Sequence, residues 1–424
     1  MNFPSESFQS RDSQQAGSPL KVVSWQRRAE VLTRPKLPCL AEFHTVNLTA
    51  GCPNECRYCY AQSYAHHPGW GKVALYANAK DRLKDELVRM RQSSRSHETP
   101  RLVYFCTASE PFVPAPRILD DLYEIMAALL DTGAALVIST KGIVPERFVA
   151  LFARYAGKVC VQVGITTLDD EARRLIEPRA ALVPERLDNL ARLIGNSGTA
   201  GNSGTGSGTQ RSEHCASPRS SLCARNSIEA RIDPLVPGLT DTDASLAALL
   251  SELARIGVCE AVVSYLFLRW GIKFANDLAL GDWSSLAMRK LYTHKVSNYC
   301  GGGTIYLPPT EYRAERFAVI AALASTHAIA VKICRCKNGD VPEAVCCHPT
   351  DSLVGSGAET AEGVGSGEVA EPTDSPQARQ HTEPSWGSAF PETPTPHARQ
   401  HTEPSWGSAF PETPTPHARQ LTLF

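Results

Sequence analysis

Short apolar runs alternate with amphipathic helical patterns through the middle of this 424-residue chain. The runs are rich in valine and isoleucine, as strands buried on both faces are: His44–Leu48, Leu102–Cys106, Ala135–Thr140, Val159–Ile165, Ile228–Ile232 and Ala261–Phe267. Helical patterns lie between them at Ala79–Arg91, Arg117–Asp131, Pro145–Tyr155, Pro184–Ile194 and Thr242–Ile256. This alternation predicts an α/β fold with a parallel sheet, and about six such units make an open, partial (β/α)6 barrel. Active-site residues are then expected just after the strands.

The segments on either side of this core, and one insertion within it, have a different composition. Residues 1–38 are polar and are expected to form a mobile N-terminal arm. The Gly/Ser-rich residues 196–227 interrupt a helix-to-strand connection and predict a disordered surface insertion. Residues 346–424 predict a disordered tail, in which the block ARQHTEPSWGSAFPETPTPH at 378–397 is repeated unchanged at 398–417. The folded core is therefore assigned to residues 39–345.

Charge and hydropathy give little information about partners but argue against a membrane protein. Lysine and arginine number 43 against 44 aspartate and glutamate, so net charge gives no reason to expect a polyanionic partner. The most apolar stretch, Phe317–Cys334, contains several polar residues and predicts an alanine-rich helix followed by a strand. The N-terminus lacks the charged-then-apolar pattern of a signal peptide. We expect a cytoplasmic protein without a membrane segment.

Three of the 14 cysteines, Cys52, Cys56 and Cys59, follow the first predicted strand directly. In a reducing compartment, clustered cysteines indicate metal binding or catalysis before disulfides. Thiolates separated by three and then two residues can hold an iron–sulfur cluster, and three ligands leave one iron open. Structural zinc is the alternative, but it needs four ligands, and no nearby cysteine or histidine clearly completes this group. The spacing therefore favours a [4Fe–4S] cluster.

The segment CPNECRYCY, residues 52–60, resembles the CxxxCxΦC motif of the radical S-adenosylmethionine (SAM) superfamily, where Φ is an aromatic residue. About residues 40 to 345, without the insertion, resemble the spore photoproduct lyase branch of that superfamily. The likeness is carried by Leu75–Asn78, Cys106–Glu110, Ser139–Lys141, Val163–Thr167, Glu177–Arg179 and Arg231–Gly238. It implies a [4Fe–4S] cluster that cleaves SAM to a 5′-deoxyadenosyl radical, and an electron donor such as flavodoxin or ferredoxin.

The same resemblance suggests which residues bind SAM. Ser109 and Glu110 follow the second strand, where the superfamily places residues that meet the SAM amino group. Lys141, at the end of the third strand, is a candidate partner of the SAM carboxylate, a role that suits a point-charge ammonium. Arg179 is a second candidate for that carboxylate. For both cations, a solvated loop position is the alternative.

Cys106 ends the second strand in the segment FCTASE. This position is close to that of the lyase cysteine that returns a hydrogen atom to the substrate radical, so the resemblance implies a catalytic role. The segment that follows is one residue longer than the lyase pattern. A packing role at a strand end is the alternative.

A second cysteine group lies near the end of the core. Its members, Cys334, Cys336, Cys346 and Cys347, are followed by His348. Such a group can bind an auxiliary cluster or zinc, because Cys-x-Cys and Cys-Cys pairs separated by a short loop can converge. A reduced, structural or incidental group is the alternative.

The last five residues resemble the QLxLF peptide by which bacterial DNA polymerases and repair proteins dock on the sliding clamp. Gln420 supplies the amide, and Leu421, Leu423 and Phe424 are the apolar anchors. Together with the lyase resemblance, this motif favours a DNA lesion as substrate. A lesion flipped out of duplex DNA implies a basic rim, for which the candidates are Arg82, Lys84, Arg89, Arg91, Arg95 and Arg101. The alternative is radical modification of a protein, peptide or small metabolite, with the tail as a recruitment arm.

Overall fold

The computed structural model describes residues 20–35, 43–92, 100–196, 226–269, 290–297 and 303–345, together with residue 353. Residues 1–19, most of the Gly/Ser-rich insertion and nearly all of the tail lie outside these residues. So do Arg95, Cys346, Cys347, His348 and the clamp-like residues 420–424.

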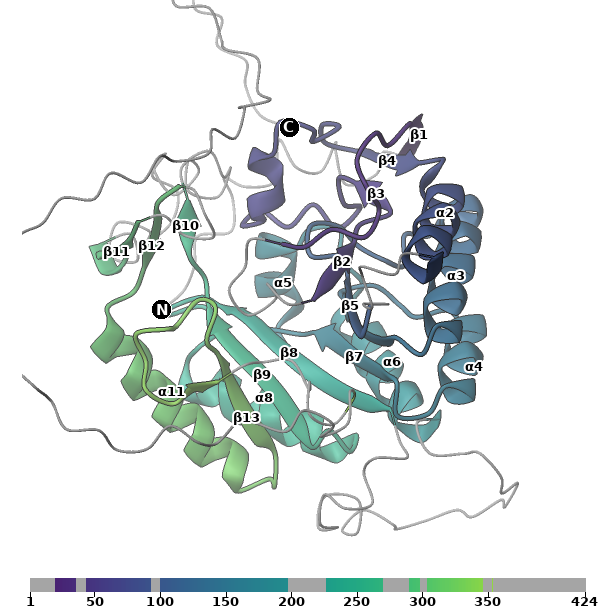
Figure 1. Ribbon diagram of the computed structural model, residues 1–424. Coiled ribbons are helices and arrows are strands. Elements are labelled where there is room, and N and C mark those ends of the chain that lie inside the picture. The colour runs from purple at the N-terminus through teal and green to yellow at the C-terminus, as the bar shows by residue number, and fades with distance from the viewer. Residues whose placement is uncertain are drawn as a thin grey trace, which may run out of the picture. The chain divides into compact units, whose positions relative to one another are not determined.

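A parallel sheet of eight strands forms the centre of the described chain (Figure 1). Its strands, in spatial order, are β14 (Ala344–Val345), β13 (Ala330–Cys334), β9 (Glu260–Tyr265), β8 (Ser227–Leu235), β7 (Val159–Gly164), β6 (Ala135–Thr140), β5 (Leu102–Phe105) and β2 (His44–Val46). All neighbouring strands in it run parallel. The six predicted strands are confirmed, and β13 and β14 extend the sheet beyond them.

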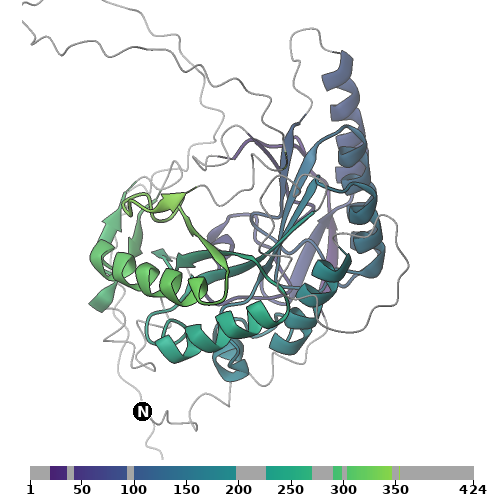
Figure 2. The ribbon, with the colours of Figure 1, turned by 90° about the horizontal axis from the view of Figure 1, so that it is seen from below.

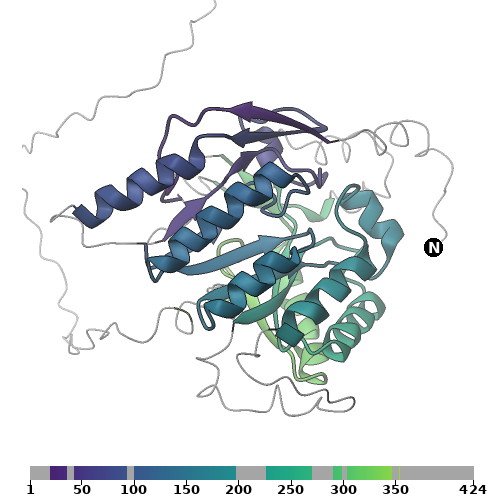
Figure 3. The ribbon, with the colours of Figure 1, turned by 90° about the vertical axis from the view of Figure 1, so that its right-hand side faces the viewer.

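Seven helices accompany the sheet within the described residues. They are α2 (Ala79–Gln92), α3 (Pro116–Asp131), α4 (Glu146–Arg154), α5 (Asp170–Ile176), α6 (Val183–Asn196), α8 (Asp243–Arg255) and α11 (Thr310–Ser325). Figures 2 and 3 show them along the outer face of the curved sheet, with α2 beside α3 and α8 beside α11. The alanine-rich stretch is helix α11 followed by strand β13, as expected.

The hydrophobic core lies between the sheet and these helices. On β5, Val103 and Phe105 belong to the main core, whereas Leu102 and Tyr104 belong to a separate cluster on the other face. On α3, Ile118, Leu122, Ile125, Met126 and Leu129 recur at helical spacing, and all are buried. Burial on both faces explains why these strands are apolar without alternation.

Two smaller sheets lie beside the main one. The first contains β1 (Lys21–Trp25), β4 (Lys72–Tyr76) and β3 (Thr49–Ala50), and the second contains β10 (Leu268–Arg269), β12 (Ile305–Leu307) and β11 (His294–Val296). The short 3₁₀ helix η2 (Tyr60–Ser63) follows β3. No helix in the described part of the chain is long and apolar enough to cross a membrane.

The expectation of a mobile arm over residues 1–38 needs correction for residues 20–35. Strand β1 pairs in parallel with β4 along its whole length. Farther on, the buried Glu86 carboxylate accepts hydrogen bonds from the backbone N–H groups of Val31 and Leu32, at 2.8 and 3.0 Å. Both of these residues are buried. The polar composition of residues 20–35 gave no sign that they are ordered, because backbone hydrogen bonds to residues far away in the sequence hold them in place.

Candidate active site

A cavity of about 630 Å³ lies where the strands of the main sheet end. Its walls include residues at or just after the carboxyl ends of β2, β5, β6, β8 and β13, such as Asn47, Cys106, Lys141, Asp233 and Cys336. In a parallel sheet these ends meet at one edge, which is the position predicted for the active site.

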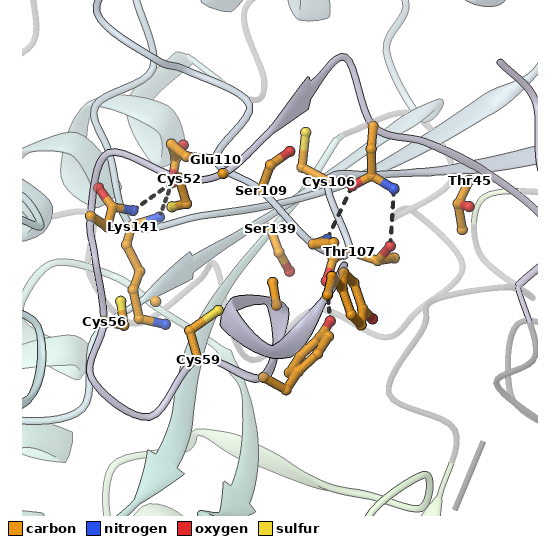
Figure 4. Close-up of a pocket in the computed structure, with 18 of the residues that line it drawn as sticks. Thr45, Cys52, Cys56, Cys59, Cys106, Thr107, Ser109, Glu110, Ser139 and Lys141 are labelled. Carbon is orange, nitrogen blue, oxygen red and sulfur yellow. Dashed lines mark hydrogen bonds between the residues drawn. The ribbon is translucent and has the colours of Figure 1, made fainter. Parts of the chain in front are cut away.

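The three motif cysteines all line this cavity. They lie on the loop between β3 and η2, and Figure 4 shows them with Lys141 on one side of the pocket. The loop is fixed from both directions: the Arg57 N–H donates to the Ile176 carbonyl at 2.9 Å, and the Cys59 N–H donates to the Cys56 carbonyl at 3.0 Å. Gly51, with a φ of +74°, begins the loop, and a Cβ there would lie 2.6 Å from Cγ of Pro68.

The chemistry of these thiols fits an iron–sulfur cluster. Burial raises the pKa of all three thiols, that of Cys56 to about 12; in addition, Cys56 and Cys59 raise the pKa of Cys52, and Cys59 raises that of Cys56. Lys141 acts in the opposite direction on Cys56 and Cys59. No three His, Cys, Asp or Glu side chains in the described part of the chain converge as ligands of a single metal ion. Three cluster thiolates would bind three separate irons, so this cysteine group suits a cluster better than zinc.

Glu110 supports the cavity wall through a saturated set of hydrogen bonds. Its carboxylate accepts from the side chains of Asn54 and Thr140, and from the backbone N–H groups of Phe112 and Lys141. A carboxylate offers about four acceptor positions, and these four donors occupy them. Glu110 thereby ties the cysteine loop to the ends of β5 and β6. The SAM-binding role predicted for this residue would require one of these bonds to be replaced.

Ser109 and Cys106 lie close together on the cavity wall (Figure 4). The Ser109 hydroxyl oxygen is buried and makes no hydrogen bond of normal geometry among the described residues, but it lies close enough to the Cys106 thiol to lower the pKa of that thiol. A ligand that offers a better-aligned partner would therefore stabilise this hydroxyl. Cys106 is buried, has a left-handed φ of +58°, and donates its backbone N–H to the Val46 carbonyl at 2.9 Å. Burial raises the pKa of its thiol to about 12, so the S–H bond is intact at neutral pH.

Lys141 lies beneath the cysteine loop, next to a charged residue that the sequence motifs did not assign a function. Its Nζ is 3.7 Å from Oε1 of Glu177 and donates to the Asp233 carbonyl at 3.3 Å. Burial alone would lower the pKa of Lys141, but the negative charges of Glu177, Cys56 and Asp233 raise it. Lys141 is therefore a cation within the cavity wall, as its predicted role requires.

Glu177 is fully buried and joins several parts of the site. It accepts hydrogen bonds from the Tyr58 hydroxyl at 2.5 Å and from Nη1 of the buried Arg186 at 2.7 Å. Burial alone would raise its pKa, but the positive charges of Arg186 and Lys141 lower it. Tyr58 and Glu177 lie 119 positions apart in the sequence, so local spacing gave no sign of this contact.

Arg179 is not among the described residues that line the cavity. Its Nη1 lies 3.6 Å from Oε2 of Glu55, and its backbone N–H donates to the Asn54 carbonyl at 3.3 Å. Arg179 thus braces the cysteine loop from behind. Of the two cations predicted for the SAM carboxylate, the structure brings only Lys141 to the cavity.

The second cysteine group is only partly described. Cys334 and Cys336 both line the cavity. They lie at and just after the end of β13, near one edge of the main sheet, whereas β5 and β2 form the other edge. Cys334 is buried against Val262 and keeps its thiol, whereas Cys336 takes part in a disulfide bond. A metal site formed by this group would require Cys336 to be reduced.

The predicted basic rim on α2 lies away from the cavity. Among the described residues, Arg82, Lys84, Arg89, Arg91 and Arg101 are absent from its walls, and Lys84 pairs with Glu124 of α3. Helix α2 packs on α3 in the outer layer, so the alternative interpretation of these basic residues, an ordinary solvated helix face, fits the structure better than a rim. The cavity has its own excess of cations over carboxylates: Arg27, Lys141, Arg231, Arg269 and Lys337 against Glu110 and Asp233.

Several known proteins resemble this chain in sequence. Residues 46–204 match the family model described as the radical SAM superfamily. An uncharacterised protein of Mycobacterium tuberculosis is 27% identical over 301 residues, which covers 68% of this chain and 76% of that protein. An uncharacterised protein of Acidianus two-tailed virus is 25% identical over 165 residues, or 36% of this chain and 52% of that protein.

Solved structures of spore photoproduct lyase have a similar fold. One, complexed with dinucleoside spore photoproduct, superposes with a TM-score of 0.53 at 14% identity, over 78% of this chain and 87% of that chain. Another, a double mutant of the lyase with bound AdoMet and the same dinucleoside, gives 0.51 at 14% identity, over 78% and 86%. Residues 46–204 thus resemble a radical SAM domain, and the fold is similar to that of the spore photoproduct lyases.

Proposed function

We propose that this chain is a radical SAM enzyme that repairs DNA lesions by chemistry similar to that of spore photoproduct lyase. One observation carries the proposal: the three motif cysteines and the Cys106 thiol line the same cavity at the carboxyl ends of the parallel strands. A [4Fe–4S] cluster held by Cys52, Cys56 and Cys59, with SAM, would supply a 5′-deoxyadenosyl radical. The surrounding residues would bind SAM, orient the lesion and return a hydrogen atom.

The proposed SAM contacts follow from what the cavity wall offers. The Ser109 hydroxyl, which makes no hydrogen bond of normal geometry in the described residues, would accept from the SAM amino group, and Lys141 would be the cation for its carboxylate. Glu110 fixes the backbone of Lys141 through the Lys141 N–H, and fixes the cysteine loop through the Asn54 side chain. Its role in SAM binding is therefore proposed to be positioning, and that of Arg179 support of the cysteine loop.

Three findings support a DNA substrate. Solved structures with this fold are complexed with dinucleoside spore photoproduct. The cavity has more cations than carboxylates, and phosphodiesters are anions. Cys106 has the protonated thiol that a hydrogen-atom donor needs. Radical modification of a protein, peptide or small metabolite remains the second candidate, since none of the cluster or SAM contacts depends on the substrate.

The decisive experiment uses the anaerobically reconstituted full-length protein with SAM, dithionite and an ultraviolet-irradiated oligonucleotide, analysed by mass spectrometry. We expect 5′-deoxyadenosine and loss of a specific photoproduct mass. A Cys59→Ala variant should do neither, because one cluster ligand is missing. Release of 5′-deoxyadenosine with unaltered DNA would favour the second candidate, and SAM cleavage by Cys59→Ala would contradict the cluster assignment.

We also propose two further binding sites that involve residues outside the described part of the chain. The first is a second metal site at Cys334, Cys336, Cys346 and Cys347, tested by comparing the iron and zinc content of the reduced protein with that of a Cys334→Ala/Cys336→Ala variant. An unchanged metal content would make this group a disulfide or packing feature. The second is docking on the sliding clamp through Gln420, Leu421, Leu423 and Phe424.

A further inference from the structure

Aromatic side chains follow the third motif cysteine along one edge of the cavity. Tyr60, Tyr64, His66 and His67 line the cavity, and Trp70 comes next on the same loop. We call these five residues the aromatic rim. Their rings are neighbours: centroids lie 5.9 Å apart for Tyr60 and Tyr64, 5.5 Å for Tyr64 and His66, and 6.3 Å for His67 and Trp70.

Backbone hydrogen bonds hold the outer part of the rim, whereas Tyr60 is held by packing and by the hydrogen bond from its hydroxyl to the Thr107 carbonyl. The Tyr64 N–H donates to the Ala61 carbonyl at 3.2 Å, and the His67 N–H donates to the Tyr64 carbonyl at 2.9 Å. Nδ1 of His67 accepts from the Gly69 N–H at 3.1 Å, so its tautomer is fixed with the proton on Nε2. These bonds order the loop before any ligand binds, which lowers the entropic cost of binding.

The rim leaves aromatic surface exposed on the Tyr64 side of the cavity and on Trp70, whose ring neighbours the cavity-lining His67. The exposed fractions of Tyr64 and Trp70 are 36% and 42%, whereas Tyr60, deeper in, stacks on Phe267 with centroids 6.1 Å apart. The exposed rings of Tyr64 and Trp70 add little to the hydrophobic core, so packing alone does not explain them. Exposed, neighbouring aromatic rings that border a cavity mark a binding surface.

Cations continue this surface into the cavity. Nζ of Lys337 lies 5.5 Å from the centroid of the Phe267 ring, and Arg269 lies two residues farther along the chain. Asp233 is a shared partner of Lys337 and Arg231, so two cations here face one carboxylate. An occupant that suits both parts has flat aromatic rings and regularly placed negative charges. Nucleobases on a phosphodiester backbone have both, whereas an aromatic peptide lacks the anions.

We propose that the aromatic rim stacks unpaired bases of a nucleic-acid strand beside the lesion, while Arg269 and Lys337 face the phosphates. The proposal rests on the proposed DNA substrate and adds how the strand is held. A base that stacks on Tyr64 or Trp70 has left its own helix. The strand must therefore be locally unpaired on at least one side of the lesion.

The test is fluorescence anisotropy of the cluster-loaded full-length protein with a short labelled thymidine oligonucleotide, at fixed salt. The Tyr64→Ala/Trp70→Ala double variant should bind the oligonucleotide at least ~10-fold more weakly, since each base-aromatic stack contributes well over that factor at the upper end of its range. Tyr64→Phe/Trp70→Phe keeps the rings and should bind like the unaltered protein. An abasic strand of equal charge should bind weakly to all three proteins.

Several results would overturn the proposal. The first is an alanine variant that binds the oligonucleotide as tightly as the unaltered protein does. The others are a phenylalanine variant that loses as much affinity as the alanine variant, or an abasic strand that binds as tightly as the thymidine strand. Tighter binding of a perfect duplex than of the single strand would also exclude it, as would binding of aromatic peptides in place of DNA. Release of 5′-deoxyadenosine by the unaltered enzyme without DNA is measured separately. It tests the radical SAM function independently of these affinities.

Discussion

Cys106 combines features that a packing cysteine does not need. Its φ of +58° lies in a region that costs a non-glycine residue of order ~1–3 kcal/mol, and such strain gathers at functional sites. It lines the cavity beside the buried Ser109 hydroxyl. Its raised thiol pKa keeps the proton in place at neutral pH. The alternative of simple packing explains burial but leaves the strained backbone unexplained.

Replacing Cys106 with alanine should separate SAM cleavage from product formation. We expect Cys106→Ala to release 5′-deoxyadenosine while the substrate radical ends in abnormal products, because its hydrogen donor is gone. Product distribution in the unaltered enzyme should stay constant with pH across the neutral range, since the pKa of the thiol is about 12. Mass spectrometry of the products is the measurement. The matched control is Cys160→Ala, a cysteine buried on β7 outside the cavity lining, and an identical product spectrum for Cys106→Ala would leave packing as its role.

Glu177 compensates buried positive charge at the base of the cysteine loop. Replacing it by glutamine leaves Arg186, which is 1% exposed, and the nearby Lys141 without their anion. Removing one partner of a buried ion pair costs about 3–5 kcal/mol. Urea denaturation of Glu177→Gln should show a loss of that size, whereas Glu171→Gln, an exposed residue of α5, should stay within about 0.5 kcal/mol of the unaltered protein.

The same ion pair makes stability depend on pH. The folded-state pKa of Glu177 is lowered from its ordinary 4.5, because the charges of Arg186 and Lys141 outweigh the effect of burial. Its contribution is therefore complete above about 4.5 and disappears as pH falls through the lowered value. Acid titration of stability should be shallower in Glu177→Gln than in the unaltered protein. Equal acid sensitivity of the two would show that other carboxylates dominate.

At the scale of elements, the sequence predicted those parts of the fold whose signals are local. Strands such as β6 and β7 are continuous apolar runs, and their helices have clear spacing. The strands β10 and β3 have two residues each, too few to form a pattern, and the seven-residue α5 is also short. The cysteine loop was predictable because its ligands share one segment. The Tyr58–Glu177 contact was not, because the fold alone brings those residues together.

Gly164 shows how the end of β7 makes room for the site. A Cβ at this position would lie 2.9 Å from Cγ and 3.0 Å from Nζ of Lys141. Gly164→Ala should therefore displace the flexible lysine from the cavity wall while the fold is kept. We expect SAM binding to the holoenzyme, measured by calorimetry, to weaken by about tenfold, as expected for a lost charge-assisted hydrogen bond.

The control for this prediction is Gly195→Ala on α6, where a Cβ meets nothing within 4 Å. It should leave SAM affinity unchanged and favour the helix slightly, because alanine has the higher helix propensity. If Gly164→Ala and Gly195→Ala bind SAM equally well, Lys141 does not contact the SAM carboxylate.

At the scale of the whole molecule, the folded core and the repeat-containing tail pose different problems. In the core, parallel strands bring residues that are distant in the sequence to one edge of the sheet, and their contacts there indicate a function. Apart from the buried Leu353, the tail lies outside the described residues, so only its sequence indicates a role. Its two identical blocks contain no pattern for a core, while its last five residues have the spacing of a docking peptide. A tether with a terminal anchor raises the local concentration of the enzyme near DNA without a large interface.

Binding of the tail to the sliding clamp is therefore expected to depend on its end and not on its repeats. The full-length protein should bind its host's clamp with a Kd of roughly micromolar strength, as a short peptide with few anchors can supply. Leu423→Ala/Phe424→Ala should abolish binding in surface plasmon resonance, because the apolar anchors are lost. Deleting residues 398–417, one copy of the repeat, should leave the affinity unchanged, since the anchor and a long tether both remain. If the repeat deletion weakens binding as much as the double substitution, or if the full-length protein does not bind, the terminal motif is a chance match and the DNA substrate loses one of its independent supports.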